Sequence, residues 1–420
     1  MAGRFYGTLL SAAVAALSLA VLCGCENQQQ AAEKGQEDKK ITLTWMTTGT
    51  TRGNSAAAKA VEEKLQACAE EISPDVEIQV VRLPDEQYYA TLKLQLAAGT
   101  APDFIYVQAK HAGENSVIRL AKAGYLEPLS DLDSRLLETE AVKEGLSYRD
   151  VPYAVGRDRL FILGTSYNKK IFAEYGLQIP RDWEEFLACC ETLKSRGVVP
   201  VTMGDRDAYV TQWGLYQLAA NVVYAQQPDF DRGLWNGETR FTDPGTWDTV
   251  IEMYGELYAR GYMDEDSFKM GQVGAAEKFR SGGAAMTFSI YYEDTEEFGV
   301  FPLPGNAKGQ ETRLVADRGG SGMGVYAGSP HKELCKQILE LYYKNREPAD
   351  QSSWPKAYRE ALENGTAVGI CNRNWPSGTE NELEKLFLEH ICERKLSVDE
   401  VVAGVQYKLE ELIERYGREE

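Results

Sequence analysis

The sequence predicts an α/β protein, because strand patterns alternate with amphipathic helices along its first quarter. The segment ITLTWMTT, 41–48, is rich in β-branched residues and alternates as a strand does. The next patterns along the chain are a helix over 54–71, a strand over 76–81, a helix from Asp85 closed by Gly99, and a strand over 103–107. This order predicts a parallel sheet with helices on its faces.

The same pattern indicates where a ligand would bind. In open α/β sheets, ligands lie in the crevice beyond the carboxyl ends of the strands. Thr47 and Thr48 end the first predicted strand, and Gln108 follows the third. We therefore expect these three residues at a binding site.

A second group of strand and helix patterns begins near residue 157. Strand patterns occur at 159–168, 198–204 and 282–290, and helix patterns at 180–197, 209–224, 245–260 and 272–281. A strand over 322–329, a helix over 330–345 and a helical C-terminus over 380–417 follow. A chain of this length suits two domains.

The N-terminus has the order of a secretory signal: Arg4, then an apolar run that ends at Gly24. The residues LCGC at 22–25 resemble the lipobox of bacterial lipoproteins, which implies that Cys25 is lipidated; an ordinary secretory signal is the alternative. The polar stretch 26–40 cannot bury itself and is expected to be a flexible tether. The mature protein would then be anchored at the outer face of the cytoplasmic membrane.

Composition argues against several classes of function. The net charge of −19 disfavours nucleic acid, whose affinity depends on cations at phosphates. The sequence has no phosphate-binding loop and no zinc-protease motif, and its three histidines are far apart, so we expect no metal, no cofactor and no enzymatic activity. Six cysteines follow the anchor; buried free thiols are favoured, and disulfide pairing stays open.

Seven motifs in order connect the chain to a known family. They are AAGTAPDFIYVQ, GYLEPLSDL, VPYAVG, the stretch from TSYNKK to GVVPV, FRSGGAAMTF, FPLPG and SGMGVYAGSPHKELCKQIL. Together they resemble the extracellular solute-binding proteins of family 1, the maltose-binding protein group. The resemblance implies two lobes joined by a hinge, each a mostly parallel sheet flanked by helices. It also implies a monomer that delivers a carbohydrate to the permease subunits of an ABC importer.

The family crosses between its lobes three times, which sets the expected domains. Residues 1–24 are the signal and 25–40 the tether. Lobe 1 would comprise 41–156 and about 321–365, and lobe 2 would comprise 157–320 and about 366–420. The third crossing, around 362–370, is the least defined.

A sugar offers an apolar face to aromatic rings and hydroxyls to polar groups. By the resemblance, Tyr291 and Tyr292 follow a strand where the family places a stacking ring, and Trp375 precedes a late helix where the family has another. A core position is the alternative for Trp375 and for one of the two tyrosines. Trp213 suits core or cleft equally.

Other positions concern polar contacts and the identity of the ligand. Gln108 is the expected polar contact, and Arg157 and Asp158 follow the first crossing, where the maltose binder has an acidic contact. Thr47 and Thr48 stand where that protein has charged residues, which argues for another ligand. An oligosaccharide is favoured, while a monosaccharide, a sugar acid or a cationic solute stays open. A sensory subunit that reports to a membrane kinase, and a secreted glycosidase, are the alternative functions.

Overall fold

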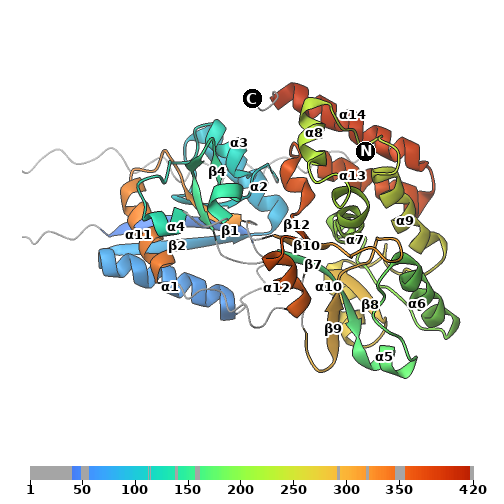
Figure 1. Ribbon diagram of the computed structural model, residues 1–420. Coiled ribbons are helices and arrows are strands. Elements are labelled where there is room, and N and C mark those ends of the chain that lie inside the picture. The colour runs from blue at the N-terminus through green and yellow to red at the C-terminus, as the bar shows by residue number, and fades with distance from the viewer. Residues whose placement is uncertain are drawn as a thin grey trace, which may run out of the picture. The chain divides into compact units, whose positions relative to one another are not determined.

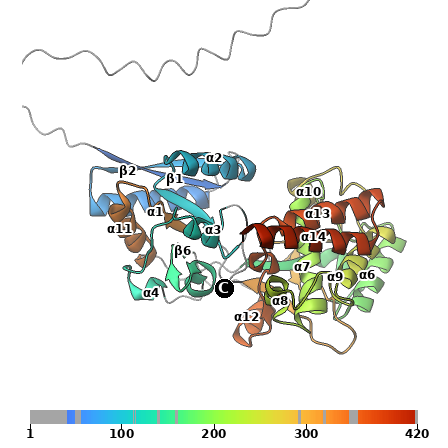
Figure 2. The same ribbon diagram turned by 90° about the horizontal axis from the view of Figure 1, so that it is seen from above.

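The computed structural model describes residues 40–48, 56–111, 113, 115–137, 141–156, 161–290, 294–317, 321–345 and 355–416. The expected signal peptide, Cys25 and the tether up to residue 39 lie outside these ranges. Ile41–Glu420 forms one unit of the chain, and it contains two main sheets. Both views keep the elements of the first sheet apart from those of the second (Figures 1 and 2).

The first sheet has the strand order β2-β1-β3-β11-β6. Its strands are β1 (Ile41–Thr48), β2 (Val76–Leu83), β3 (Phe104–Gln108), β6 (Ala154–Gly156) and β11 (Ser321–Val325). β1 pairs in parallel with both β2 and β3, as the alternating pattern predicts. β11 runs antiparallel to β3 and to β6, so the sheet is mixed.

Helices cover both faces of this sheet because its strands are apolar on both sides. Leu43 and Trp45 of β1 pack with α1 (Ala56–Ile72) and α11 (Lys332–Lys344). Met46, on the opposite face, packs with α2 (Asp85–Ala98) and α3 (Val117–Lys122). Shorter elements complete this part: α4 (Ser134–Leu137), η1 (Ala141–Gly145), β4 (Ser147–Tyr148) and β5 (Val151–Pro152).

The second sheet differs from the expected parallel arrangement. Its order is β12-β10-β7-β8, with β9 also on β7, and its strands are β7 (Phe161–Asn168), β8 (Met286–Ser289), β9 (Phe298–Phe301), β10 (Leu314–Asp317) and β12 (Ala367–Val368). β8, β9 and β10 all run antiparallel to β7, and only β10 and β12 are parallel. Sequence patterns give the positions of strands but not their directions, so this part of the prediction was wrong.

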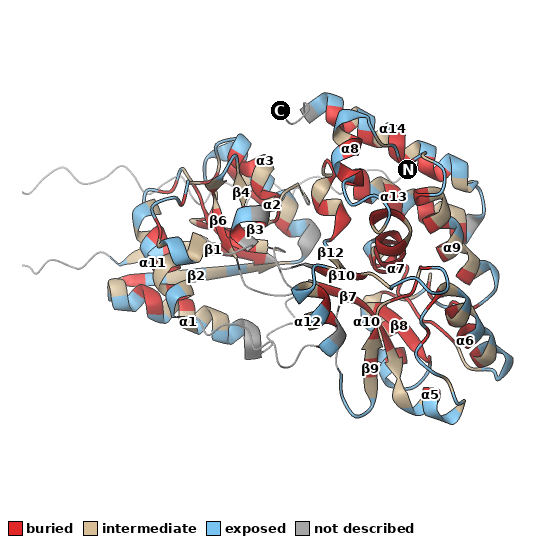
Figure 3. Ribbon diagram, viewed as in Figure 1, coloured by how far each residue is buried: buried red, intermediate tan, exposed pale blue. Residues whose placement is uncertain are grey.

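Helices surround the second sheet and form the larger core. They are α5 (Lys169–Glu174), α6 (Trp183–Ser195), η2 (Ala208–Val210), α7 (Thr211–Ala219), η3 (Ala220–Tyr224), α8 (Phe230–Asn236), α9 (Trp247–Ala259), α10 (Gln272–Arg280), α12 (Lys356–Glu363), η5 (Cys371–Asn374), α13 (Thr379–Leu388), η6 (Glu389–Glu393) and α14 (Val398–Tyr416). Helix α7 lies at the centre and is almost wholly buried (Figure 3). Most of its residues are apolar or aromatic, and its buried Gln217 donates to the carbonyl of Trp213, so the helix is suited to a core.

The third connection between the two sheets lies earlier than expected. Tyr358 and Ala361 of α12 pack against Ile162, Leu314 and Ala316 of the second sheet. The last described element that packs on the first sheet is therefore α11. The expected end of lobe 1 near residue 365 is too late in the chain. We call 41–156 with 321–344 lobe 1, and 161–317 with 355–416 lobe 2.

The cysteines of the described ranges are free thiols. Cys68, Cys189, Cys190, Cys335 and Cys371 are buried, whereas Cys392 is exposed. Within these ranges, no helix has the length and apolar character that a membrane crossing needs.

Candidate ligand-binding site

Two connections leave lobe 1 from one edge of its sheet. Gly156 at the end of β6 pairs with Gly322, and Ser321 at the start of β11 pairs with Gln108. The carboxyl end of β1 lies at the same edge because β1 and β3 are parallel. We call this edge, with Thr47, Gln108 and the ends of β6 and β11, the crossover edge of lobe 1.

Lobe 2 has a corresponding edge. Phe161, where β7 begins, pairs with Asp317, where β10 ends. β8 runs antiparallel to β7 and ends at Ser289, opposite Gly164. The chain after Ser289 therefore starts close to the end where the two connections enter. We call this end the crossover edge of lobe 2.

Polar groups on the crossover edge of lobe 1 are held in place by neighbours. Gln108 is half-buried, and its Nε2 donates to the hydroxyl of Tyr89 at 2.8 Å. Thr47 is buried at the end of β1. The side chain of Thr48 lies outside the described part. Gln108 thus has a fixed orientation, which favours selective hydrogen bonding to a ligand.

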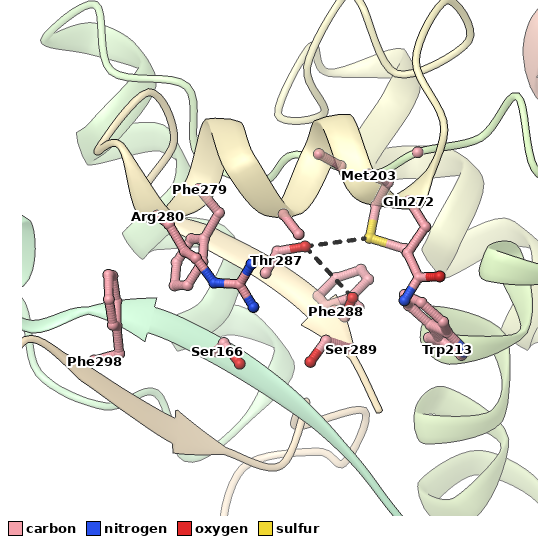
Figure 4. Close-up of a pocket in the computed structure, with 13 residues that line it drawn as sticks. Ser166, Met203, Trp213, Gln272, Phe279, Arg280, Thr287, Phe288, Ser289 and Phe298 are labelled. Carbon is pink, nitrogen blue, oxygen red and sulfur yellow. Dashed lines mark hydrogen bonds between the residues drawn. The ribbon is translucent and has the colours of Figure 1, made fainter. Parts of the chain in front are cut away.

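A small pocket lies between β7, β8, α7 and α10 of lobe 2 (Figure 4). Its volume is about 60 Å³, and it is lined by the polar residues Ser166, Gln272, Arg280, Thr287 and Ser289 and by Met203, Gly204, Trp213, Ala275, Ala276, Phe279, Phe288 and Phe298. A cavity needs about 10–15 Å³ of such volume to hold one water molecule. The pocket could therefore hold a few small groups of a ligand but not a whole oligosaccharide.

Beside this pocket stands an exposed aromatic ring. Tyr209 is 47% exposed, and its hydroxyl donates to Oε1 of Gln272 at 2.8 Å. The backbone N–H of Gln272 donates to Oδ2 of Asp207 at 2.9 Å. Trp213 packs edge-on against Tyr209, with ring centroids 6.0 Å apart. The start of α10 therefore positions an exposed ring, and an exposed tyrosine ring can stack on the apolar face of a sugar.

The residues predicted to bind ligand are only partly assembled by the described structure. Gln108 lies at the crossover edge of lobe 1, and Trp213, 7% exposed, lines the small pocket. The predicted residues Tyr291, Tyr292, Arg157 and Asp158 lie outside the described residues.

Trp375 differs from the expectation that it stacks on a ligand. Its side chain is fully buried, with edge-to-face contacts to Tyr216, Phe241 and Trp247. Its indole N–H donates to Asp231. A ring enclosed on these sides offers no face to a sugar in this structure, so the core alternative describes Trp375 better.

Two buried carboxyl groups of lobe 2 titrate near neutrality. Burial raises the pKa of Asp205 to about 7, although Oδ2 accepts from the hydroxyl of Tyr258. Burial also raises the pKa of Glu384 to about 7, against a hydrogen bond from Gln212. Asp205 directly follows Met203 and Gly204, which line the pocket. A charge on Asp205 would therefore lie next to the pocket wall.

The chemistry available to this site is hydrogen bonding and ring stacking. Among the residues whose placement is described, no group of three His, Cys, Asp or Glu side chains could hold a metal ion. Gln108, Gln272 and Asp207 offer polar contacts, and Tyr209 offers a ring.

Comparison with known families agrees with this geometry. The family model for bacterial extracellular solute-binding proteins matches residues 48–347. The chain belongs to this family. The solute-binding protein shares 22% identity with the multiple sugar-binding protein of Streptococcus mutans, over 80% of this chain and 78% of that relative. It shares 26% identity with an uncharacterized ABC transporter extracellular-binding protein of Pyrococcus horikoshii, over 51% of this chain and 49% of that relative, so the match spans about half of that relative's length.

A solved structure described as a chitin oligosaccharide binding protein has the same fold. It superimposes on the solute-binding protein with a TM-score of 0.75 at 21% identity, over 89% of this chain and 99% of that one. These findings confirm the predicted family and the two-lobed α/β fold.

Sequence reasoning missed Tyr209, Asp207 and Gln272 of the solute-binding protein. A signal was present: the polar stretch GDRDAY, 204–209, follows a predicted strand in the way that Gln108 follows another. The link between Gln272 and Tyr209 had no such signal because the two residues are 63 positions apart.

Proposed function

We propose that the protein captures an oligosaccharide between its two lobes and delivers it to an ABC importer. The observation that supports this most is the pair of crossover edges, which belong to different lobes. Gln108 offers a fixed amide on the edge of lobe 1. On lobe 2, Tyr209 offers an exposed ring and bonds Gln272, which lines the same pocket as Ser289 at the end of β8. A ligand that needs both would bind only when both lobes contact it.

The preference for an oligosaccharide rests on chemistry and on similar proteins. Tyr209 supplies a stacking surface, and Gln272 and Asp207 supply hydrogen-bonding groups beside it. Gln108 supplies another polar group on lobe 1. A multiple sugar-binding protein and a chitin oligosaccharide binding protein are among the proteins that the chain is similar to. Tyr291 and Tyr292, which follow β8, are proposed to add further rings.

Location and delivery complete the proposal. Lipidation of Cys25 would hold the protein at the outer face of the cytoplasmic membrane, where a captured sugar meets the permease subunits. Two or more acyl chains hold a protein stably to a bilayer, whereas one does so only marginally.

Calorimetric titration with neutral oligosaccharides of graded length and linkage tests the proposal. We expect saturable binding of one sugar per chain, and Tyr209→Ala or Gln108→Ala should weaken it roughly tenfold or more, since about 1.4 kcal/mol corresponds to tenfold. Tyr407→Ala is the matched control because Tyr407 is 73% exposed on α14, a helix that contributes no residue to the lining of the pocket. Equal affinity for the Tyr209 and Tyr407 variants would contradict the proposed site.

A further inference from the structure

A short segment of lobe 2 makes direct contacts with lobe 1. The carbonyl of Arg373 accepts from the backbone N–H of His111 at 3.0 Å, and Oδ1 of Asn374 accepts from Nζ of Lys110 at 3.1 Å. The ring of His111 lies against Trp235 of α8, with centroids 4.8 Å apart. Lys110 and His111 follow β3 directly, so this contact joins the crossover edge of lobe 1 to lobe 2.

A buried carboxylate holds the lobe 2 side of this contact. Asp231 is 6% exposed, and its oxygens accept from Tyr224 Oη at 2.7 Å, Trp375 Nε1 at 2.9 Å and Asn374 Nδ2 at 2.9 Å. The carbonyl of Asn374 also accepts from the indole of Trp235 at 2.6 Å. Both ends of the Asn374 amide are therefore used: Nδ2 binds Asp231, and Oδ1 binds Lys110.

The buried charge of Asp231 contributes to the energy of this arrangement. Burial raises the pKa of Asp231, while its three hydrogen bonds and the charge of Lys110 lower it. A buried charge is costly unless a counter-charge and hydrogen bonds compensate it. The cation that acts on Asp231 comes from the other lobe.

The backbone of Lys110 is specialised for this position. Its φ is +50°, in the left-handed region that residues other than glycine seldom occupy. Hydrogen bonds from its N–H to Gly145 and from Ile118 to its carbonyl hold this conformation. Strain of this kind persists where the surroundings fix it, and it often marks a functional position.

We propose that Lys110, Asn374 and Asp231 form a relay that holds the two lobes in the arrangement of this structure. The ammonium of Lys110 donates to the Asn374 amide, which donates to the carboxylate of Asp231. When the lobes move apart at this contact, Asp231 loses its counter-charge, so the relay opposes that movement. The relay thereby adjusts the equilibrium between lobe arrangements without touching a ligand.

Hydrogen exchange on the ligand-free full chain tests this relay directly. The His111 amide reports the contact, because its hydrogen bond crosses between the lobes. Amides of Gln108, bonded within lobe 1, and Val201, bonded within lobe 2, serve as internal references. The variants are Lys110→Met, Lys110→Arg, Asp231→Asn and the double change Lys110→Met with Asp231→Asn. Lys332→Met is the matched control because it removes an ion pair with Glu127 inside lobe 1.

Lys110→Met and Asp231→Asn should each speed exchange at His111 roughly tenfold, the scale expected for a hydrogen bond to a charged group. The double variant should be no faster than the faster single variant, and Lys110→Arg should restore slow exchange because it keeps a cationic donor. Unchanged exchange at His111 in Lys110→Met would overturn the relay. So would a double variant in which the rate increase at His111 equals the product of the increases in the two single variants.

The Asp231→Asn measurement needs a further control because Asp231 lies in the core of lobe 2. If Asp231→Asn also speeds exchange at Val201, it has loosened lobe 2 as a whole. The comparison of Lys110→Met with Lys110→Arg then decides, since Lys110 is only half-buried and lies on the other lobe. No sugar is added, so failure of this test is distinct from failure of the proposed function.

Discussion

The indole Nε1–H of Trp375 donates to Oδ1 of Asp231 at 2.9 Å, inside the core of lobe 2. Trp375 is fully buried there, among Tyr216, Phe241 and Trp247. This bond and these contacts make Trp375 a structural residue.

Trp375→Ala should therefore lower the free energy of unfolding by about 3–5 kcal/mol, the range for removing a large buried aromatic side chain. Trp375→Phe should cost less because it keeps most of the ring packing and loses the hydrogen bond to Asp231. Urea titrations of the ligand-free variants measure both values. A near-normal unfolding curve for Trp375→Ala, together with a loss of sugar affinity, would return Trp375 to the binding site.

Asp205 and Glu384 make stability depend on pH near neutrality. The pKa of each is about 7 in the folded protein, whereas carboxyl groups of an unfolded chain lose their proton near pH 4. Between these values the folded state binds more protons, so the free energy of unfolding falls as pH rises, by about 1.4 kcal/mol per pH unit for each group.

Asp205→Asn should remove one of these two contributions, because asparagine keeps a hydrogen-bond acceptor for Tyr258 but carries no titrating proton. Unfolding titrations at several pH values between 5 and 8 should then give a shallower slope. Glu265→Gln is the control, since Glu265 is exposed and follows Asp264, whose charge contributes to the raised pKa of Asp205. An identical slope for wild type and Asp205→Asn would show that Asp205 does not titrate in this range.

Gly204 allows the pocket wall to meet the start of α10. A Cβ at this position would lie 2.3 Å from the carbonyl carbon of Gly271 and 2.4 Å from the backbone nitrogen of Gln272. Gly204→Ala should therefore destabilise the protein by about 1–3 kcal/mol and displace Gln272, which holds Tyr209. Thermal unfolding and sugar titration should both change. Gly274→Ala, on α10 with its nearest contact at 3.3 Å from the Met270 side chain, should leave both nearly unchanged.

The register of the lipobox predicts which cysteine carries lipid. Cys25→Ser should abolish labelling by a fatty acid and release the protein from the membrane fraction, because Cys25 follows the small residue Gly24. Cys23→Ser should keep both the label and the membrane location. Labelling that depends on Cys23 alone would mean that the register is wrong.

Local patterns predicted lobe 1 better than lobe 2. The strands around Trp45, Val80 and Ile105 were evident because alternation and neighbouring helices are short-range features. Strand direction in lobe 2 depends on which distant segments pair, such as Thr165 with Phe288, and local pattern does not encode that choice.

Local sequence patterns predict the residues of the candidate site even less well than they predict strand direction. Trp375 lies between Asn374 and Pro376, a setting typical of an exposed loop, but Asp231, 144 positions earlier, anchors it in the core. The place of Gln108 at the crossover edge of lobe 1 was predictable because Gln108 ends a strand pattern. The exposure of Tyr209 was not, since it depends on packing against α10.

Small-angle X-ray scattering, with and without a saturating oligosaccharide identified by calorimetry, tests the central claim most directly. If the sugar contacts both crossover edges, the lobes should close on it and the radius of gyration should fall. Gln108→Ala should bind the sugar more weakly. At a sugar concentration that saturates the wild-type protein but not this variant, the decrease in its radius of gyration should therefore be smaller or absent. An unchanged radius of gyration at proven saturation of the wild-type protein would contradict capture between the lobes.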